Sequence, residues 1–241
     1  MAQYLYGKNS VLNAIEAKKV IEVFLKENFK DENVFKILKE NKIFYSFKRK
    51  EEIDFLSNNQ KNQGIIAKIN DYKSINLDEL IDKNKGNESS ILIVLDNLED
   101  PHNLGAILRI ADAFNVDGII YKKNNQVGLT PTVAKVSTGA INFVDCVEVT
   151  NLNQTISKLK EYGYWVYASD MNAKHNYFDI KYPSKTVLII GSEGFGISRL
   201  VKENSDELIK IPMSGHVDSL NASNACAIIV SEVYRQLKLK N

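Results

Sequence analysis

The sequence predicts an α/β protein in which a small mixed unit precedes a larger domain with a parallel β-sheet. From residue 91 onward, continuous apolar runs of strand length alternate with helical stretches, a pattern typical of parallel strands covered by helices on both faces. Before residue 70, strand and helix patterns alternate at shorter spacing, and a polar stretch separates the two regions. We therefore expect a first domain at 1–75, a linker at 76–90 and a second domain at 91–241.

The expected first domain contains two helical and three strand-like segments. Apolar residues follow helical spacing from Val11 to Ile15 and again around Phe35 and Leu38. Strand-like segments rich in β-branched and aromatic residues lie at 20–25, 43–47 and 64–69. The polar stretch KNKGNESS at 83–90 offers no apolar face for burial, so we expect an exposed linker there.

The expected second domain contains five strand-like apolar runs, at 91–95, 118–121, 164–167, 187–190 and 208–211. Helical stretches lie between most of them. The first of these helices is expected to begin at Asp100 and Pro101, because Asp is a good N-cap and Pro a good first helical residue. Its apolar stripe would consist of Leu104, Ile107, Leu108, Ala111 and Phe114.

Composition places the chain among globular proteins of a reducing compartment. Hydrophobic residues make up 44% and charged residues 25% of the chain, which are ordinary proportions. No apolar run is long enough to span a bilayer, and the N-terminus lacks the pattern of a signal peptide. Cys146 and Cys226 are too few for a disulfide framework, and His216 has no clustered partners that would indicate a metal site. We therefore expect a cytoplasmic protein with no metal and no membrane partner.

Charge is unevenly distributed along the chain, although the net charge is only +1. Residues 1–75 carry 14 Lys and Arg against 10 Asp and Glu, whereas residues 76–241 carry 17 against 20. A basic first domain beside an acidic second one fits an RNA-docking module attached to a catalytic domain. A solvated basic face would give the same counts, so charge alone leaves both interpretations open.

Three segments that follow predicted strands carry the candidate chemistry, since ligands of open α/β sheets bind at the carboxyl ends of the strands. The first, DPHNLGAILR at 100–109, places Arg109 on a helix face of small residues, where a solvated surface arginine is the alternative. The second, GSEGFG at 191–196, has glycines that allow close backbone approach to a ligand, although a tight turn has the same pattern. The third, at 211–225, is a polar loop leading into a helix that Ser219 could cap.

Together, in this order and spacing, the three segments resemble the signature motifs of the SpoU branch of the SPOUT methyltransferases. That branch transfers a methyl group from S-adenosylmethionine to a ribose 2′-OH of RNA. The N-terminal region resembles the small RNA substrate-binding domain, related to kink-turn-binding ribosomal proteins, of the RlmB-type enzymes. The segments YGKNSV at 6–11 and NQGIIA at 62–67 carry this likeness, while Asn62 stands where the family commonly has histidine.

The resemblance implies a deep trefoil knot near the C-terminus, a homodimer with the active site near the subunit interface, and S-adenosylmethionine as cofactor. The residues implied to bind the cofactor are Thr138, Gly139, Gly191, Glu193, Gly194, Ile211, Met213 and Leu220. The residues implied to act in catalysis are Arg109, Asn103, Glu193, Ser219 and Asn221. No metal is implied, because the sulfonium is already a good leaving group.

The resemblance assigns the central catalytic role to Arg109, in some family members as a general base. An arginine side chain has a pKa above about 12, so neutralising one at pH 7 would cost about 7 kcal/mol at ~1.4 kcal/mol per pH unit. We therefore expect a charged Arg109 to bind the adjacent phosphate and stabilise the developing alkoxide, while the phosphate or water takes the proton. Asn103 and Glu193 would orient Arg109 and the ribose, and Ser219 and Asn221 would bind the nucleotide or hold the loops.

The N-terminal domain favours an rRNA enzyme over the tRNA enzymes that lack it, and the expected target is a guanosine of large-subunit (23S) rRNA. A tRNA 2′-O-methyltransferase and an antibiotic-resistance rRNA methyltransferase remain alternatives. A non-enzymatic RNA-binding protein would have no reason to keep Arg109, Glu193 and Asn221 in these settings. A nicotinamide-dependent oxidoreductase needs G-x-G-x-x-G after its first strand, and DNLED at 96–100 stands there instead.

Overall fold

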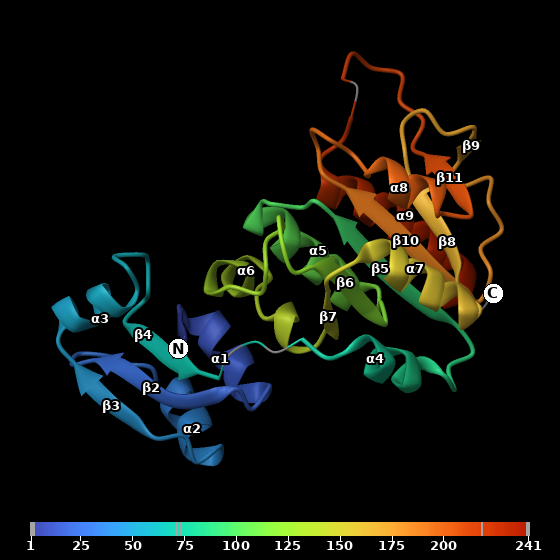
Figure 1. Cartoon of the computed structure of the whole chain (residues 1–241). Coiled ribbons are helices and arrows are strands. Elements are labelled where there is room, and N and C mark those ends of the chain that lie inside the picture. Colours follow the sequence, from blue (N-terminus) through green and yellow to red (C-terminus); the bar gives the residue numbers. More distant parts are fainter. Residues whose placement is uncertain (1–2, 71, 73, 218, 240–241) are drawn as a thin grey trace. The chain divides into compact units, whose positions relative to one another are not determined.

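The computed structural model describes residues 3–70, 72, 74–217 and 219–239, and the chain forms two compact units (Figure 1). The first unit consists of residues 1–73 together with Leu129–Phe143. The second unit consists of Ser74–Gly128 together with residues 144–241. The division therefore differs from a simple tandem of two chain segments, since Leu129–Phe143 was expected in the second domain.

The sheet of the first unit has four strands in the order β1-β4-β2-β3. These strands are β1 (Gln3–Tyr6), β2 (Val20–Lys26), β3 (Tyr45–Lys48) and β4 (Ile65–Ile69). The edge strand β3 runs parallel to β2, whereas β4 runs antiparallel to both β1 and β2. The helices are α1 (Lys8–Glu16), α2 (Glu32–Glu40), α3 (Lys50–Leu56), α6 (Pro131–Val136) and the short 3-10 helix η1 (Ala140–Asn142). The three predicted strands are confirmed, and β1 is an additional one.

Helix α6 and the turn after it pack within the first unit. Asn13 on α1 donates a hydrogen bond to the Thr138 carbonyl oxygen, and the Lys135 ammonium lies 4.7 Å from the centre of the Tyr6 ring. Thr138 and Gly139 both have positive φ, at 51° and 101°, a conformation that glycine adopts readily and other residues rarely. A Cβ on Gly139 would also lie 2.6 Å from the Cβ of Asn13. The turn therefore requires glycine at this position.

The sheet of the second unit has seven parallel strands in the order β7-β6-β5-β10-β8-β11-β9 (Figure 1). These strands are β5 (Ser90–Asp96), β6 (Gly118–Lys122), β7 (Cys146–Val149), β8 (Trp165–Ser169), β9 (His175–Asn176), β10 (Lys185–Gly191) and β11 (Glu207–Lys210). The helices are α4 (Leu77–Asn84), α5 (Pro101–Ala113), α7 (Leu152–Glu161), α8 (Arg199–Glu203) and α9 (Ala222–Leu237). The five predicted apolar runs are confirmed as β5, β6, β8, β10 and β11, and the parallel sheet is confirmed with them.

Apolar side chains fill both faces of this sheet, which is why the strands contain continuous apolar runs. Strand β5 is buried along its whole length, and its Leu92 and Val94 share one core cluster with residues of α4, α7 and α8. On the opposite side, α5 packs against α9. Helix α5 starts as predicted, since the Asp100 side chain accepts a hydrogen bond of 2.9 Å from the His102 N–H and Pro101 is the first helical residue.

Residues 77–84, which the sequence analysis expected within an exposed linker, form helix α4 of the second unit. Asn76 caps this helix by accepting a hydrogen bond of 2.8 Å from the Glu79 N–H. Leu80 and Ile81 are buried in the core of the unit. Few apolar residues in a polar context were enough for a helix, because the sheet supplies the rest of the buried surface. Across the described residues, no helix is both long enough and apolar enough for a membrane crossing.

Candidate functional site

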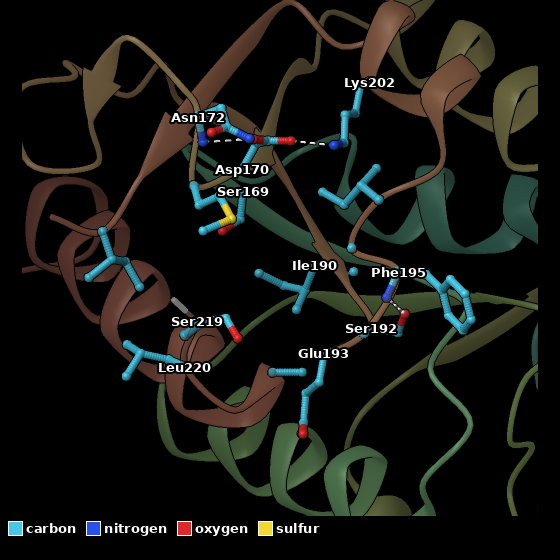
Figure 2. Close-up of a pocket in the computed structure, with 18 of the residues that line it drawn as sticks. Ser169, Asp170, Asn172, Ile190, Ser192, Glu193, Phe195, Lys202, Ser219 and Leu220 are labelled. Carbon is cyan, nitrogen blue, oxygen red and sulfur yellow. Dashed lines mark hydrogen bonds and ion pairs between the residues drawn. The ribbon is translucent and has the colours of Figure 1, made fainter. Parts of the chain in front are cut away.

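A pocket of about 400 Å³ lies in the second unit, at the carboxyl ends of β8, β10 and β11 and beside the start of α9 (Figure 2). This is the edge of the sheet at which the sequence analysis placed the candidate chemistry. The pocket is lined by Ser169, Asp170, Met171, Asn172, Ile190, Gly191, Ser192, Glu193, Gly194, Phe195, Gly196, Ile197, Lys202, Ile211, Met213, Ser219, Leu220, Ala222 and Ala225. Residues from the second and third candidate segments therefore share one pocket.

The glycine loop after β10 is a tight turn that closes on itself. The Gly196 N–H donates a hydrogen bond of 2.9 Å to the Ser192 carbonyl oxygen, and Gly196 has a positive φ of 63°. A Cβ added to Gly191 would lie 2.5 Å from the Gly196 carbonyl oxygen and 2.6 Å from the Ile197 nitrogen. Because both neighbours are backbone atoms, the loop could not give way without opening. Gly194 has nothing within 4 Å of an added Cβ, so sterics within the loop do not require it.

Asp96, at the end of β5, anchors the chain that leaves this loop. Its side chain is fully buried, and one carboxylate oxygen accepts a hydrogen bond of 2.7 Å from the Ser198 N–H. The other oxygen, Oδ1, is buried with no hydrogen-bond partner among the described residues. A buried carboxylate that holds a backbone N–H stabilises one loop conformation, so Asp96 positions the glycine loop. Asp96 is not among the catalytic or cofactor-binding residues predicted from the sequence.

The three candidate segments meet in a triangle of hydrogen bonds formed by Asn103, Glu193 and Asn221, which we call the polar triangle. The Asn103 amide donates to Glu193 Oε1 at 2.8 Å. The Asn221 amide donates to the same oxygen at 2.5 Å and to Asn103 Oδ1 at 2.9 Å. Asn103 is buried, whereas Glu193 and Asn221 are exposed. Each predicted segment thus contributes one member to a single polar cluster.

Asn221 also caps α9, a role that the sequence analysis offered to Ser219. The Asn221 side-chain oxygen accepts hydrogen bonds from the Ser223 N–H at 3.0 Å and from the Asn224 N–H at 3.4 Å. Both Ser and Asn are good caps, so local sequence did not distinguish them. Ser219 and Leu220 instead line the pocket together with Ile211 and Met213. Asp218, which belongs to the same segment, lies outside the described residues.

Arg109 lies on α5, six residues after Asn103, and its side chain is exposed. Within the described part of the chain, the Arg109 side chain takes part in no hydrogen bond or ion pair. It is not among the residues that line the pocket. An exposed guanidinium without an internal partner is available to an anion from outside this chain, since its five donors match carboxylate or phosphate oxygens.

Thr138 and Gly139, expected near the cofactor, belong to the first unit, whereas the pocket belongs to the second. Neither residue lines the pocket. Within the first unit they hold the turn described above, where the Thr138 carbonyl accepts from Asn13. Their role in cofactor binding stays a prediction.

Asp170 and Lys202 form an ion pair on the pocket wall that the sequence analysis missed (Figure 2). Asp170 follows β8, and its side chain also accepts a hydrogen bond of 2.8 Å from the Asn172 N–H. Burial alone would raise the pKa of Asp170, but the hydrogen bonds from Lys202 and Asn172 hold this pKa below its ordinary value. The position of Asp170 at the carboxyl end of a strand is the signal that could have identified it.

The remaining sequence expectations concern metal ligands and thiols. The described residues contain no group of three or more His, Cys, Asp or Glu side chains arranged to hold a metal ion. His216 is exposed in its loop. Cys146 and Cys226 are free and buried, and burial raises the pKa of each thiol to about 12. Neither cysteine has the lowered pKa of a nucleophilic thiol.

Asn62, which the resemblance sets where histidine is expected, is a structural residue of the first unit. Its amide donates hydrogen bonds of 2.9 Å to the Asp54 carboxylate and to the Ser57 hydroxyl. Its side-chain oxygen accepts from the Gly64 N–H at 2.9 Å. Asn62 therefore ties the end of α3 to the start of β4, and all of its side-chain hydrogen-bonding groups are used internally.

Two family models match this chain. Residues 90–231 match the SpoU rRNA Methylase family, and residues 4–74 match RNA 2′-O ribose methyltransferase substrate binding. The first match contains the pocket and the polar triangle. The second covers most of the first unit but not its Leu129–Phe143 segment.

Known proteins are similar to the chain over all or part of its length. A TrmH family tRNA/rRNA methyltransferase of Staphylococcus haemolyticus is 44% identical over 96% of this chain and 95% of its own. The AdoMet-bound rRNA methyltransferase of Sinorhizobium meliloti has a TM-score of 0.83 at 20% identity, covering 99% of this chain and 88% of that one. The TrmH/SpoU tRNA modifying enzyme of A. aeolicus has a TM-score of 0.56 at 29% identity, over 66% of this chain and 81% of that one.

Proposed function

Because the chain belongs to the SpoU rRNA methylase family, we propose that it transfers a methyl group from S-adenosylmethionine to a ribose 2′-hydroxyl of RNA. The observation that carries this proposal is the polar triangle of Asn103, Glu193 and Asn221, placed beside a pocket that the glycine loop closes. All three signature segments of the resemblance contribute to it. The substrate-binding family model over residues 4–74 supports RNA as the acceptor.

We propose large-subunit rRNA as the substrate, with a guanosine as the methylated nucleotide. The rRNA methyltransferase of Sinorhizobium meliloti resembles the fold of this chain over almost its whole length. The tRNA modifying enzyme of A. aeolicus resembles it over 66% only. The first unit is the part that favours the ribosomal substrate, and the choice of guanosine follows from the sequence resemblance alone.

The pocket fits S-adenosylmethionine in shape and in charge. The backbone of Gly196 and Ile197 fills the space that a side chain on Gly191 would need, so the glycine loop folds back tightly and its backbone lines the pocket. Ile190, Ile211 and Leu220 offer apolar walls for an adenine ring. The amino-acid end of the cofactor carries an ammonium and a carboxylate, and Asp170 beside Lys202 offers the opposite charges. When bound, the cofactor supplies a methyl group on a sulfonium that needs no metal activation.

The residues of this chain would then bind and orient the nucleotide. Arg109, whose exposed side chain has no partner among the described residues, would bind a phosphate of the RNA and stabilise negative charge on the 2′-oxygen. The polar triangle holds Asn103 on the same helix in a fixed orientation. Glu193 Oε1 is already used by two donors, which leaves Glu193 Oε2 to accept from a ribose hydroxyl. The proton of the 2′-hydroxyl would pass to the phosphate or to water rather than to Arg109.

We further propose a knotted, dimeric and cytoplasmic protein. Strand β10 lies between β5 and β8, and the chain then passes through β11 into α9, which returns to pack on α5. This strand order is compatible with the C-terminal knot that the resemblance implies. The exposure of Arg109, which is not among the residues that line the pocket, fits an active site completed by a second copy of the chain.

The test is a transfer assay with S-adenosylmethionine labelled on the methyl group and a large-subunit rRNA fragment. A ribose 2′-O-methyl group blocks alkaline cleavage, so the label should appear in an alkali-resistant dinucleotide. Label in a single nucleotide would place the methyl group on a base and contradict the proposal. Arg109→Ala should reduce transfer on the order of a hundredfold or more, while calorimetry shows unchanged cofactor affinity. The matched control is Arg199→Ala, which removes another exposed arginine of the second unit and should retain activity.

A further inference from the structure

Four aromatic side chains form a continuous cluster at the β3 edge of the first unit, which we call the aromatic platform: Phe29, Phe35, Tyr45 and Phe47. The Phe35 ring on α2 has its centre 6.0 Å from that of Phe29 and 5.7 Å from that of Tyr45. It lies 6.5 Å from Phe47. Tyr45 and Phe47 are 5.9 Å apart with their planes at 88°. These are distances at which aromatic rings stabilise one another, so the platform is a preformed surface.

Two rings of the platform are open to solvent. Tyr45 is 38% exposed and Phe47 is 51% exposed. Both lie on one face of the edge strand β3, because alternate residues of a strand share a face. The side chain of Lys48, on the other face, lies 5.9 Å from the Phe24 ring centre. Packing of β3 does not require aromatic residues at exposed positions, and neighbouring exposed apolar side chains indicate a binding surface.

Lysines lie beside this surface. The first unit has a pocket of its own, of about 460 Å³, which is lined by Phe29 of the platform together with Lys8, Lys26 and Lys30. Lys8 is paired with Asp31 at 2.5 Å. Lys26 and Lys30 form no ion pair with any other described residue. The groove beside the platform therefore carries two lysine charges that no described acidic side chain pairs with.

We propose that the aromatic platform binds unpaired nucleotides of the RNA substrate. Bases stack on the exposed rings of Tyr45 and Phe47, and phosphates lie near Lys26 and Lys30. The proposal rests on the proposed function, which makes RNA the substrate, and it assigns to the first unit a preference for single-stranded segments. Stacked rings beside unpaired cations are the combination that single-strand binders use.

Charge and shape together favour this occupant. A base in a duplex has both faces covered by its neighbours, so only an unpaired base can stack on a protein ring. An apolar protein segment would use the rings but leave Lys26 and Lys30 unmatched. A phosphate backbone alone would use the lysines but leave Tyr45 and Phe47 exposed. Unpaired nucleotides satisfy both parts of the surface.

The test measures binding of the full-length chain to fluorescent oligoadenylate and to a blunt RNA duplex of equal length. A Tyr45→Leu, Phe47→Leu double variant keeps apolar side chains on β3 but removes both stacking faces. Its affinity for oligoadenylate should fall on the order of tenfold for each ring, while its affinity for the duplex stays unchanged. Its salt dependence should also stay unchanged, because no charge is removed. A Lys26→Gln, Lys30→Gln double variant should instead lower the slope of affinity against salt.

The matched controls are Phe44→Leu and Phe55→Leu. These phenylalanines are 68% and 79% exposed in the same unit but are not part of the platform, so their loss should leave oligoadenylate binding unchanged. Cofactor affinity, measured by calorimetry, reports that each variant is folded.

Wild-type affinity in the platform variant, or equal loss in the controls, overturns the proposal, and a protein partner then becomes the better explanation. Equal loss of duplex binding overturns it as well. Methylation of the rRNA fragment by the wild type is measured in parallel. An inactive wild type whose platform variant still loses oligoadenylate binding would count against the proposed function and support the platform.

Discussion

Substitution of Asn221 separates the two tasks of this side chain. Its oxygen caps α9, whereas its amide nitrogen donates to Glu193 and Asn103. Asn221→Ser keeps a capping oxygen and loses both donated bonds. Asn221→Ala loses the cap as well. Asn221→Asp keeps the cap, loses both donors and places a second carboxylate against Glu193.

The expected losses of stability follow from these contacts. Loss of an N-cap destabilises a helix by about 1 kcal/mol, and each hydrogen bond contributes about 1 kcal/mol net. Asn221→Ser should therefore cost about 2 kcal/mol and Asn221→Ala about 3 kcal/mol. Asn221→Asp loses the two bonds and adds repulsion of about 1.4 kcal/mol for charges ~3 Å apart in water. The total loss of stability in the aspartate variant at neutral pH should resemble that in the alanine variant.

The aspartate variant should differ from the alanine variant in its response to pH. The Glu193 charge raises the pKa of the new carboxyl group in the folded state, so the folded protein binds protons more readily than the unfolded chain. Stability relative to wild type should then rise as pH falls through the carboxyl range, and the alanine variant should show no such recovery. Thermal unfolding measures this, with about 2–4 °C expected per kcal/mol for a chain of this size.

Catalysis should fail in all three Asn221 variants, because each breaks the polar triangle. Methyl transfer should fall in the serine variant even though its helix remains capped, and cofactor affinity should change much less than turnover. Full activity in the serine variant would show that the triangle has no catalytic role and that Asn221 is only a cap. A pH-independent stability of the aspartate variant would show that its carboxylate does not face Glu193.

Three further predictions concern the pocket and the assembly. Gly191→Ala should abolish cofactor binding in calorimetry, because the new Cβ would lie 2.5 Å from the Gly196 carbonyl oxygen and force the glycine loop open. The control Gly86→Ala, where nothing lies within 4 Å of the new Cβ, should bind the cofactor normally. Cofactor binding by Gly191→Ala would show that the pocket does not depend on the closed loop. Lys202→Met should lower the affinity for S-adenosylmethionine but not for methylthioadenosine, which lacks the amino-acid end. The control Lys160→Met breaks an ion pair away from the pocket and should change neither affinity. An equal loss of affinity for both ligands would show that Lys202 does not bind the amino-acid end of the cofactor. Light scattering of the full chain should give twice its 27.2 kDa, and a monomer at micromolar concentration would refute the dimer.

Local sequence predicted those elements whose signals are local. Strands β5 and β10 contain apolar runs because both of their faces are buried, and such a run is visible without knowledge of the fold. The start of α5 was predictable because Asp100 and Pro101 are adjacent. The cap of α9 was not, since Ser219 and Asn221 are both suitable residues and the choice depends on Glu193 from a distant segment. Helix α4 was missed for a similar reason, because its few apolar residues are buried only against the sheet.

The candidate site shows the same limit. The family resemblance identified Asn103, Glu193 and Asn221 as candidate residues. Neither spacing nor composition indicates that Asn103 forms hydrogen bonds with Glu193, 90 residues away, and with Asn221, 118 residues away. Asp170 and Lys202 meet only because β8 and α8 end at the same pocket. Ion pairs of this kind depend on tertiary packing, so single-sequence reasoning has no signal for them.

The attachment of Leu129–Phe143 to the first unit has a consequence for the exchange of domains between related genes. The chain passes between the two units three times, near residues 73, 128 and 143. A recombination event at the first crossing alone would pair a new α1 with the old turn at Gly139, and the new α1 would keep the hydrogen bond to the Thr138 carbonyl oxygen only if it carried a donor at the position of Asn13. Hybrids between distant relatives should therefore fold well only when both segments of the first unit are inherited together. The first unit of this protein is built from two linked pieces of chain rather than from one removable module.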